Sequence, residues 1–157
     1  MIWIVAGLGM LAGGYALLDF QSTPVPQGPS SMALAMNMSE YRDAVVAFAL
    51  ANPSYTGSVP AASLAPYLGA SNANPVWRNY VQPNAGYAGS LVVVYATSAS
   101  ATAAIVGMEQ LAQGSAMAGV ALGTNIVSPG GPAVALPAVL ANAIPNGMPV
   151  WMAQAYD

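Results

Sequence analysis

The side chains of this sequence that could carry out acid–base chemistry are few. Glu40 and Asp43 stand three residues apart, so they could share one face of a helix, and Glu109 is a further carboxylate. A carboxylate pair does acid–base work only in a pocket that separates the two pKa values. Arg42 lies between the first two in sequence, which favours a solvated helix surface instead. The sequence therefore predicts no catalytic residue.

The residue types that are missing narrow the chemistry further. The chain contains no histidine, no cysteine and no lysine. This excludes an imidazole base, a thiolate nucleophile, a Schiff-base amine and ordinary zinc, haem or iron–sulfur sites, and it leaves the serines without a base partner. With two arginines and a net charge of −3, no basic patch for nucleic acid can be assembled. We expect no cofactor, no metal, no nucleic acid and no small-molecule substrate.

The overall composition indicates one folded domain with an appendage. The 157 residues are 56% hydrophobic and only 4% charged, whereas an ordinary soluble domain is about 25% charged. A sparsely charged surface is typical of proteins whose subunits pack together permanently. The composition therefore favours an assembly component over a free monomer.

The N-terminal run Ile2–Leu18 predicts a membrane anchor. It carries no charge, and as a helix it would be roughly 26 Å long, close to the ~30 Å hydrocarbon core of a bilayer. Trp3 and Tyr15 lie towards its ends, where amphipathic rings favour the interface. The nearest A-x-A site, at residues 33–35, is far behind the run, which favours an uncleaved anchor over a signal peptide.

Two glycines within this run allow a second interpretation. Gly9 and Gly13 match the small-xxx-small pattern that lets membrane helices approach closely, although glycine is frequent enough here for coincidence. The predicted organisation is an anchor over residues 1–19, a proline-rich linker over 20–31 and an exported domain over 32–157, with the N-terminus inside.

A long helix is predicted to open the exported domain, from Ser30 or Ser31 to about Ala51, where Asn52-Pro53 stops it. Apolar residues recur along it at steps of three and four and form one apolar stripe: Leu34, Met38, Tyr41, Val45 and Phe48. The stripe packs either on the domain's own sheet or in an intermolecular coiled coil. Two heptads are few for a coiled coil, which favours the sheet.

The remaining elements predict an α+β domain. We expect a long N-terminal helix packed on a sheet of three to four strands, with further short helices. The predicted helices are Ala61–Leu68 and Ser100–Gln113, with a short one from Pro137. The predicted strands are Ser90–Thr97, Met117–Val127, Pro149–Ala153 and, less regularly, Ala133–Leu136.

Several patches of the chain resemble the PilM family, which comprises short proteins of type IVb thin-pilus systems, often carried on conjugative plasmids. The patches are Tyr41-Arg42, Ala49–Pro53, Tyr55–Pro60 with Leu64, Trp77–Tyr80 and the Ile144–Gly147 turn. The resemblance implies a single-pass protein of the bacterial inner membrane with its C-terminal domain in the periplasm. It also implies a part in building the mating pilus, and it brings no catalytic residues.

The leading hypothesis is an anchored accessory protein of pilus assembly that acts by contact with the membrane, with other pilus-assembly proteins or with itself. The expected anchor residues are Ile2, Trp3, Gly9, Gly13 and Leu18, and the expected contact residues are Leu34, Met38, Tyr41, Arg42, Val45, Phe48, Trp77, Arg78 and Tyr80. Trp77-Arg78 reads equally as a cation–π patch or as a structural tryptophan beside a surface arginine. The alternatives are a pilin-like subunit of the fibre and an exported enzyme that uses carboxylates.

Overall fold

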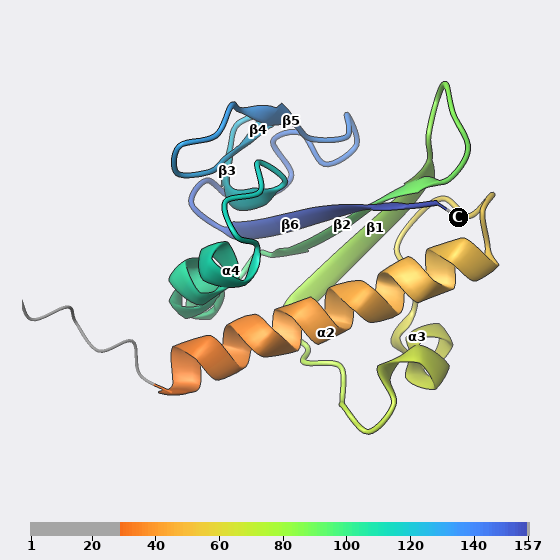
Figure 1. Ribbon diagram of the computed structural model, residues 1–157, viewed down its shortest axis with the longest axis horizontal. Coiled ribbons are helices and arrows are strands. Elements are labelled where there is room, and N and C mark those ends of the chain that lie inside the picture. The colour runs from red at the N-terminus through yellow and green to blue at the C-terminus, as the bar shows by residue number, and fades with distance from the viewer. Residues whose placement is uncertain (1–28, 157) are drawn as a thin grey trace, which may run out of the picture.

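The computed structural model describes residues 29–156, which form an α+β domain (Figure 1). No helix within this range is both long enough and apolar enough to cross a membrane. The predicted anchor lies outside the described residues, and its named positions are Ile2, Trp3, Gly9, Gly13 and Leu18.

The long helix α2 spans Pro29–Ala51 and begins slightly before the predicted boundary of the domain. Its apolar stripe faces the chain's own sheet: Met38 and Val45 are fully buried in the main core. The side chain of Asn52 donates a hydrogen bond to the carbonyl of Phe48 (2.9 Å) and so closes the last turn. The interpretation that the stripe packs within the domain is therefore confirmed.

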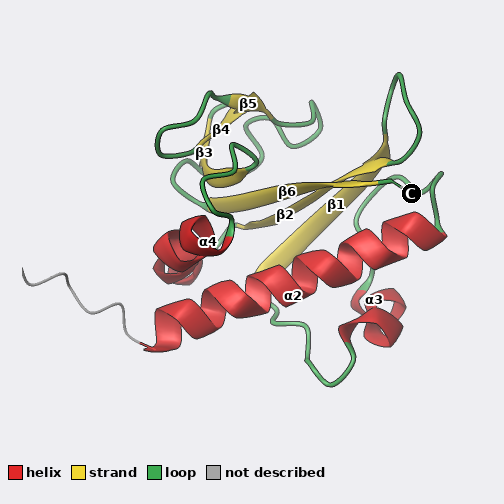
Figure 2. Cartoon of the chain, in the orientation of Figure 1, coloured by secondary structure: helices red, strands yellow, loops and turns green. Residues whose placement is uncertain are grey.

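Two further helical segments flank α2 (Figure 2). Helix α3, Ala61–Leu68, has the predicted bounds and packs against α2 through Leu64, which is fully buried. The single helix predicted over Ser100–Gln113 is instead a 3₁₀ helix, η1 (Ala99–Ala104), followed by α4 (Ile105–Leu111). The hydroxyl of Thr102 donates to the carbonyl of Ala99 at 2.7 Å within the tightened turn.

The six strands within residues 29–156 form one antiparallel sheet in the order β1-β2-β6-β3-β4-β5. The central strand β6 pairs with both β2 and β3, so it connects the β1–β2 pair to the strands β3, β4 and β5. The strands are β1 (Trp77–Pro83), β2 (Ser90–Ala96), β3 (Ala118–Leu122), β4 (Asn125–Val127), β5 (Val134–Ala135) and β6 (Pro149–Ala155).

The prediction of three to four strands is wrong for two physical reasons. Strand β1 contains arginine, asparagine, glutamine and proline, and it lies in a turn-rich stretch, so it lacks the apolar alternation that reveals a strand. The predicted strand Met117–Val127 is a hairpin, because Gly123 adopts a positive φ of 60° and reverses the chain between β3 and β4. The segment from Pro137 forms turns, with the amides of Leu140 and Ala141 both bonded to its carbonyl.

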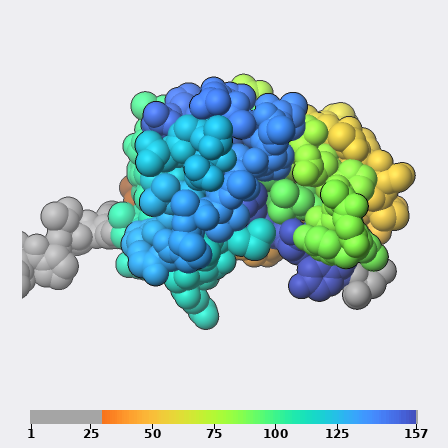
Figure 3. All heavy atoms as spheres, turned by 90° about the horizontal axis from the view of Figure 1, so that it is seen from above, coloured from red at the N-terminus to blue at the C-terminus, as the bar shows by residue number. Residues whose placement is uncertain are grey.

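The sheet carries a core on each face. On β2, Val92 and Val94 face α2, whereas Val93 faces the opposite way, and all three are fully buried. The second face is covered by apolar residues of β4 and the turns that follow it, including Ile126 and Ile144. Figure 3 shows the cyan and blue atoms of these later segments gathered over one part of the molecule, beside the green atoms of the β1–β2 region. A strand that is apolar on both faces thus has two layers to bury it.

The Ile144–Gly147 turn ties this outer layer to the β3–β4 hairpin. The side-chain oxygen of Asn146 accepts a hydrogen bond from the amide of Gly123 (2.8 Å), and the amide of Gly147 bonds to the carbonyl of Ala121 (2.8 Å). The turn therefore stabilises the fold through one side-chain and one backbone hydrogen bond.

Candidate functional site

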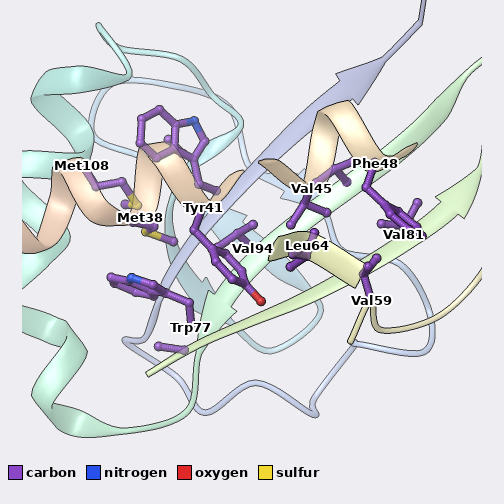
Figure 4. Packing of buried hydrophobic residues seen from close by; sticks show 14 of the residues in the cluster. Met38, Tyr41, Val45, Phe48, Val59, Leu64, Trp77, Val81, Val94 and Met108 are labelled. Carbon is purple, nitrogen blue, oxygen red and sulfur yellow. The ribbon is translucent and has the colours of Figure 1, made fainter. Parts of the chain in front are cut away.

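Three segments that are distant in sequence meet in a cleft of about 390 Å³ between α2 and the edge of the sheet. We call it the Tyr41 cleft. Figure 4 shows Tyr41 extending from α2 towards β1, near Trp77 and Val59. The residues that line it are Tyr41, Ser58, Val59, Pro60, Ala61, Ala73, Asn74, Pro75, Trp77, Arg78 and Asn79. Its volume lies within the range of about 300–1,000 Å³ typical of ligand sites.

Asn79 holds these segments together, although it is only 4% exposed. Its side-chain oxygen accepts a hydrogen bond from the amide of Val59 (2.7 Å), and its side-chain nitrogen donates to the carbonyl of Val59 (3.0 Å) and to the hydroxyl of Tyr41 (2.7 Å). The hydroxyl of Ser58 donates to the backbone carbonyl of Asn79 at 2.8 Å. One amide therefore orders the helix, the loop and the strand at once.

The outer edge of β1 is already occupied beside the cleft. Gly57 and Val81 exchange two backbone hydrogen bonds of 2.9 Å each, and Pro83 ends the strand without an amide proton. The hydroxyl of Tyr55 donates to the carbonyl of Ser58 (2.8 Å) and steadies this loop. A partner strand could therefore not extend the sheet at this position.

Arg78 is exposed and is one of the residues that line the cleft, and its guanidinium makes no hydrogen bond or ion pair to any residue in the range 29–156. Burial raises the pKa of Tyr41, while the hydrogen bond from Asn79 and the charge of Arg78 act against this rise. Burial likewise raises the pKa of Tyr95, again opposed by Arg78. Both phenols therefore keep their protons at physiological pH and can donate hydrogen bonds.

Arg42 is engaged elsewhere. Its guanidinium carbon lies 4.0 Å from the centroid of the Trp151 ring, and it forms a salt bridge of 2.7 Å to Asp43. The indole nitrogen of Trp77 donates to the side-chain oxygen of Asn37 at 2.9 Å. Of the two interpretations, the structure therefore supports a structural tryptophan at Trp77 beside a surface arginine. The cation–π contact is made by Arg42 with Trp151.

The predicted contact residues do not form one surface. Residues on the apolar stripe belong mainly to the core: Met38, Tyr41, Val45 and Phe48 are buried, and Leu34 is half-buried. Successive residues of β1 point to opposite faces, so Trp77 lies under α2 whereas Tyr80 lies half-buried against the second core. Of the nine predicted positions, Arg78 alone is exposed, and Arg42 is half-buried.

The carboxylates of the described chain do not converge. Glu40 accepts a hydrogen bond from the hydroxyl of Ser71 (2.8 Å), and Asp43 pairs with Arg42. Within residues 29–156, no three carboxylates come close enough to hold a metal ion. Glu109 is half-buried, and it lines a separate cavity of about 230 Å³.

Glu109 is expected to make stability depend on pH. Burial raises its pKa, so the folded protein holds the proton more tightly than the unfolded chain. The contribution of Glu109 to the free energy of unfolding is therefore present at low pH and is lost as the pH rises through the raised pKa. Glu109→Gln should be more stable than the wild type at neutral pH and equally stable below the ordinary glutamate pKa. Urea unfolding of both proteins at the two pH values measures the difference in stability between them. The same difference at neutral and at low pH would contradict the prediction.

Asn79 was missed by reasoning from sequence. Its signal was an asparagine amid the alternating apolar residues Trp77 and Val81, a position where a strand normally buries an apolar side chain. Such an asparagine needs hydrogen-bond partners, and those partners lie 20 and 38 residues away.

The described residues thus define a class of small α+β domain, in which a long helix lies on an antiparallel sheet and a cleft opens at the edge strand. The chain belongs to the PilM family, whose model matches residues 6–152, and it is therefore a pilus-related protein. Searches of curated proteins and of solved structures found no match.

Proposed function

We propose that this protein is a membrane-anchored accessory component of type IVb pilus assembly that acts by protein–protein contact. The observation that carries the proposal is the family match over residues 6–152, which includes most of the apolar run Ile2–Leu18 as well as the folded domain. The setting we propose is the bacterial inner membrane, with the domain in the periplasm and the pilus serving conjugation.

The short segment between the apolar run and the domain supports a domain held close to the membrane. Asp19–Gly28 is a stretch of ten residues, which spans at most ~35 Å when fully extended. A domain attached in this way would stay beside the membrane, where the other inner-membrane parts of an assembly machine are within reach.

Two features support contact rather than catalysis. The chain has no histidine, cysteine or lysine, and the carboxylates Glu40 and Asp43 are each engaged by a neighbouring side chain. The Tyr41 cleft presents hydrogen-bond donors set in apolar walls, which is the chemistry of recognition.

Deletion of the gene tests the proposal. The deletion strain should lack surface pili and fail in liquid mating, and the full chain supplied in trans should restore both. A matched complementing chain, in which residues 1–19 are replaced by a cleavable signal peptide, should restore neither, because the released domain would diffuse away from the membrane. Normal piliation in the deletion strain would rule out a role in assembly.

The same strains test the alternative of a fibre subunit. Pili sheared from the complemented strain should contain no copy of this chain if it stays in the membrane. Its presence in sheared fibres in proportion to the main pilin would favour a structural subunit instead.

A further inference from the structure

We infer that this chain associates head to tail with a second copy of itself, with Arg78 of one copy entering the cavity that Glu109 lines in the next. We call this cavity the Glu109 cavity. The inference names a partner for the proposed protein–protein contact, and it rests on the proposed function only for its setting in pilus assembly. It is drawn from the pairing of the few charges, from their places on the sheet and from the shape of the cavity.

Two charged side chains of the described residues have no partner. Within residues 29–156, Arg42 and Asp43 form a salt bridge of 2.7 Å, and Glu40 accepts a hydrogen bond from a serine hydroxyl. Arg78 and Glu109 make no hydrogen bond or ion pair within the same range. The chain also has no lysine that could take the place of Arg78. The described part of the chain therefore carries one unpaired charge of each sign.

Within one chain these two charges lie on different sides of the sheet. Arg78 is opposite Tyr95 on the edge strand β1 and alternates with Trp77, which lies under α2, so its side chain is on the face away from α2. Glu109 is on α4, which packs against α2 and β3. Strands β2 and β6 separate β1 from β3, roughly 14 Å across the sheet. A pair between Arg78 and Glu109 therefore forms between two copies.

The Glu109 cavity suits a single side chain. Val106, Glu109 and Gln110 stand at steps of three and four along α4, so one face of this helix forms a wall of the cavity. Ala118 and Pro129 add apolar surface. The volume of about 230 Å³ is below the range of about 300–1,000 Å³ typical of small-molecule sites. The aliphatic stem of an arginine can lie against such walls while its guanidinium meets the carboxylate.

The polar groups of the Glu109 cavity are unsatisfied. Glu109 is half-buried, and burial raises the pKa of its carboxyl. Ser128 lines the same cavity at 6% exposure, and its hydroxyl has no hydrogen-bond partner among the described residues. A buried polar group without a partner costs free energy. A guanidinium carries a charge and five N–H donors, so it can pair with the carboxylate and still offer a donor to the hydroxyl.

Arg78 is set among aromatic side chains that a partner can cover. Tyr95 lies directly opposite it on β2, and Tyr80 follows two positions along β1 on the same face. Both tyrosines are half-buried against the second core, so part of each side chain stays open. At the Glu109 cavity, Val106 is 45% exposed and presents apolar surface in return. Arginine beside tyrosine is typical of the residues that dominate protein–protein contacts.

The contact joins unlike surfaces of the two copies. Each copy offers Arg78 on one side of the sheet and the Glu109 cavity on the other. After two copies have joined, one cavity and one arginine remain free at the two ends. Such a heterologous contact lets further copies add, in a closed ring or an open row.

Sedimentation of the full chain in mild detergent tests the inference. The wild type should associate as its concentration rises, and raised salt should weaken the association. Arg78→Gln and Glu109→Gln should each weaken it about tenfold, because a hydrogen-bonded charge pair is lost. Glu40→Gln is the matched control: it removes a carboxylate from the exposed face of α2 and should leave association unchanged.

Glu109→Gln separates association from folding. The monomer of this variant is expected to be more stable than the wild type at neutral pH, so unfolding would not explain a loss of association. Its urea unfolding is measured at dilutions at which the chain is monomeric.

Charge reversal identifies the two sides of the contact. Arg78→Glu alone and Glu109→Arg alone should each stay monomeric. A mixture of the two proteins should associate, because the intact Arg78 of one meets the intact Glu109 of the other. Association in the mixture alone would also show that both variants are folded.

Three results would overturn the inference: a wild-type chain that is monomeric at every concentration, unchanged association in Arg78→Gln or Glu109→Gln, or a mixture of folded reversed variants that stays monomeric. In each case, loss of pili on deletion of the gene would leave the proposed function standing. Normal pili in the deletion strain, with association that depends on these two charges, would instead remove the proposed function and leave the self-association.

Discussion

Replacing Asn79 by alanine should lower the free energy of unfolding by about 3 kcal/mol, because two buried backbone groups would lose their partners. The amide and the carbonyl of Val59 both bond to this side chain, at 2.7 and 3.0 Å. The variant also unties Tyr41 from β1. For a domain of this size the loss corresponds to a fall of about 10 °C in Tm, measured by tryptophan fluorescence of the full chain in mild detergent.

Asn84 supplies the matched control for this prediction. Its side-chain nitrogen makes one long hydrogen bond, 3.4 Å, to the carbonyl of Ala88 in the exposed β1–β2 turn. Asn84→Ala should therefore change stability by less than about 0.5 kcal/mol. If Asn79→Ala costs no more than Asn84→Ala, the network does not hold the cleft together.

Trp151→Ala should be more damaging still, with a loss of about 4 kcal/mol. Trp151 lies on the central strand β6, opposite Val94 of β2 and Ala118 of β3, and is 4% exposed. Its removal would leave a cavity in the main core and also take the ring from beneath the guanidinium of Arg42. The same fluorescence-detected unfolding, with Trp77 as the reporter, measures the effect.

The control is the loss of an aromatic ring from an exposed position just beyond the same strand. Tyr156 is 61% exposed and follows β6 directly. Tyr156→Ala should cost less than about 1 kcal/mol, since little apolar surface is buried there. Similar losses for the two variants would show that burial in the core does not govern stability at Trp151.

Some elements could be predicted because their signal is local. The apolar stripe of α2 recurs at helical spacing, and Asn52-Pro53 ends the helix where expected. Helix α3 and strand β2 lie where the pattern of apolar residues and turns indicated them. In each case, residues a few positions apart carry the information.

Strand β1 and the cleft could not be predicted in this way. The sequence WRNYVQP becomes a strand because it pairs with β2 on one side and with Gly57 on the other. Arg78 was nominated from the sequence, but its separation from its neighbours Trp77 and Asn79 follows from the alternation of a strand that no pattern had revealed. The asparagine between Trp77 and Val81 shows that Asn79 needs partners, but only the tertiary structure shows that these are Val59 and Tyr41.

By itself, the sequence determined the chemical character of this protein: scarce charge, no histidine, cysteine or lysine, one apolar N-terminal run and an α+β pattern that resembles PilM proteins. The tertiary structure decided which residues are core and which can meet a partner. It placed the apolar stripe inside, left Arg78 outside and joined Tyr41 to Asn79 across 38 residues of chain. The physical reason is that local periodicity specifies helices and strands, whereas a site depends on contacts that form only when distant segments pack together.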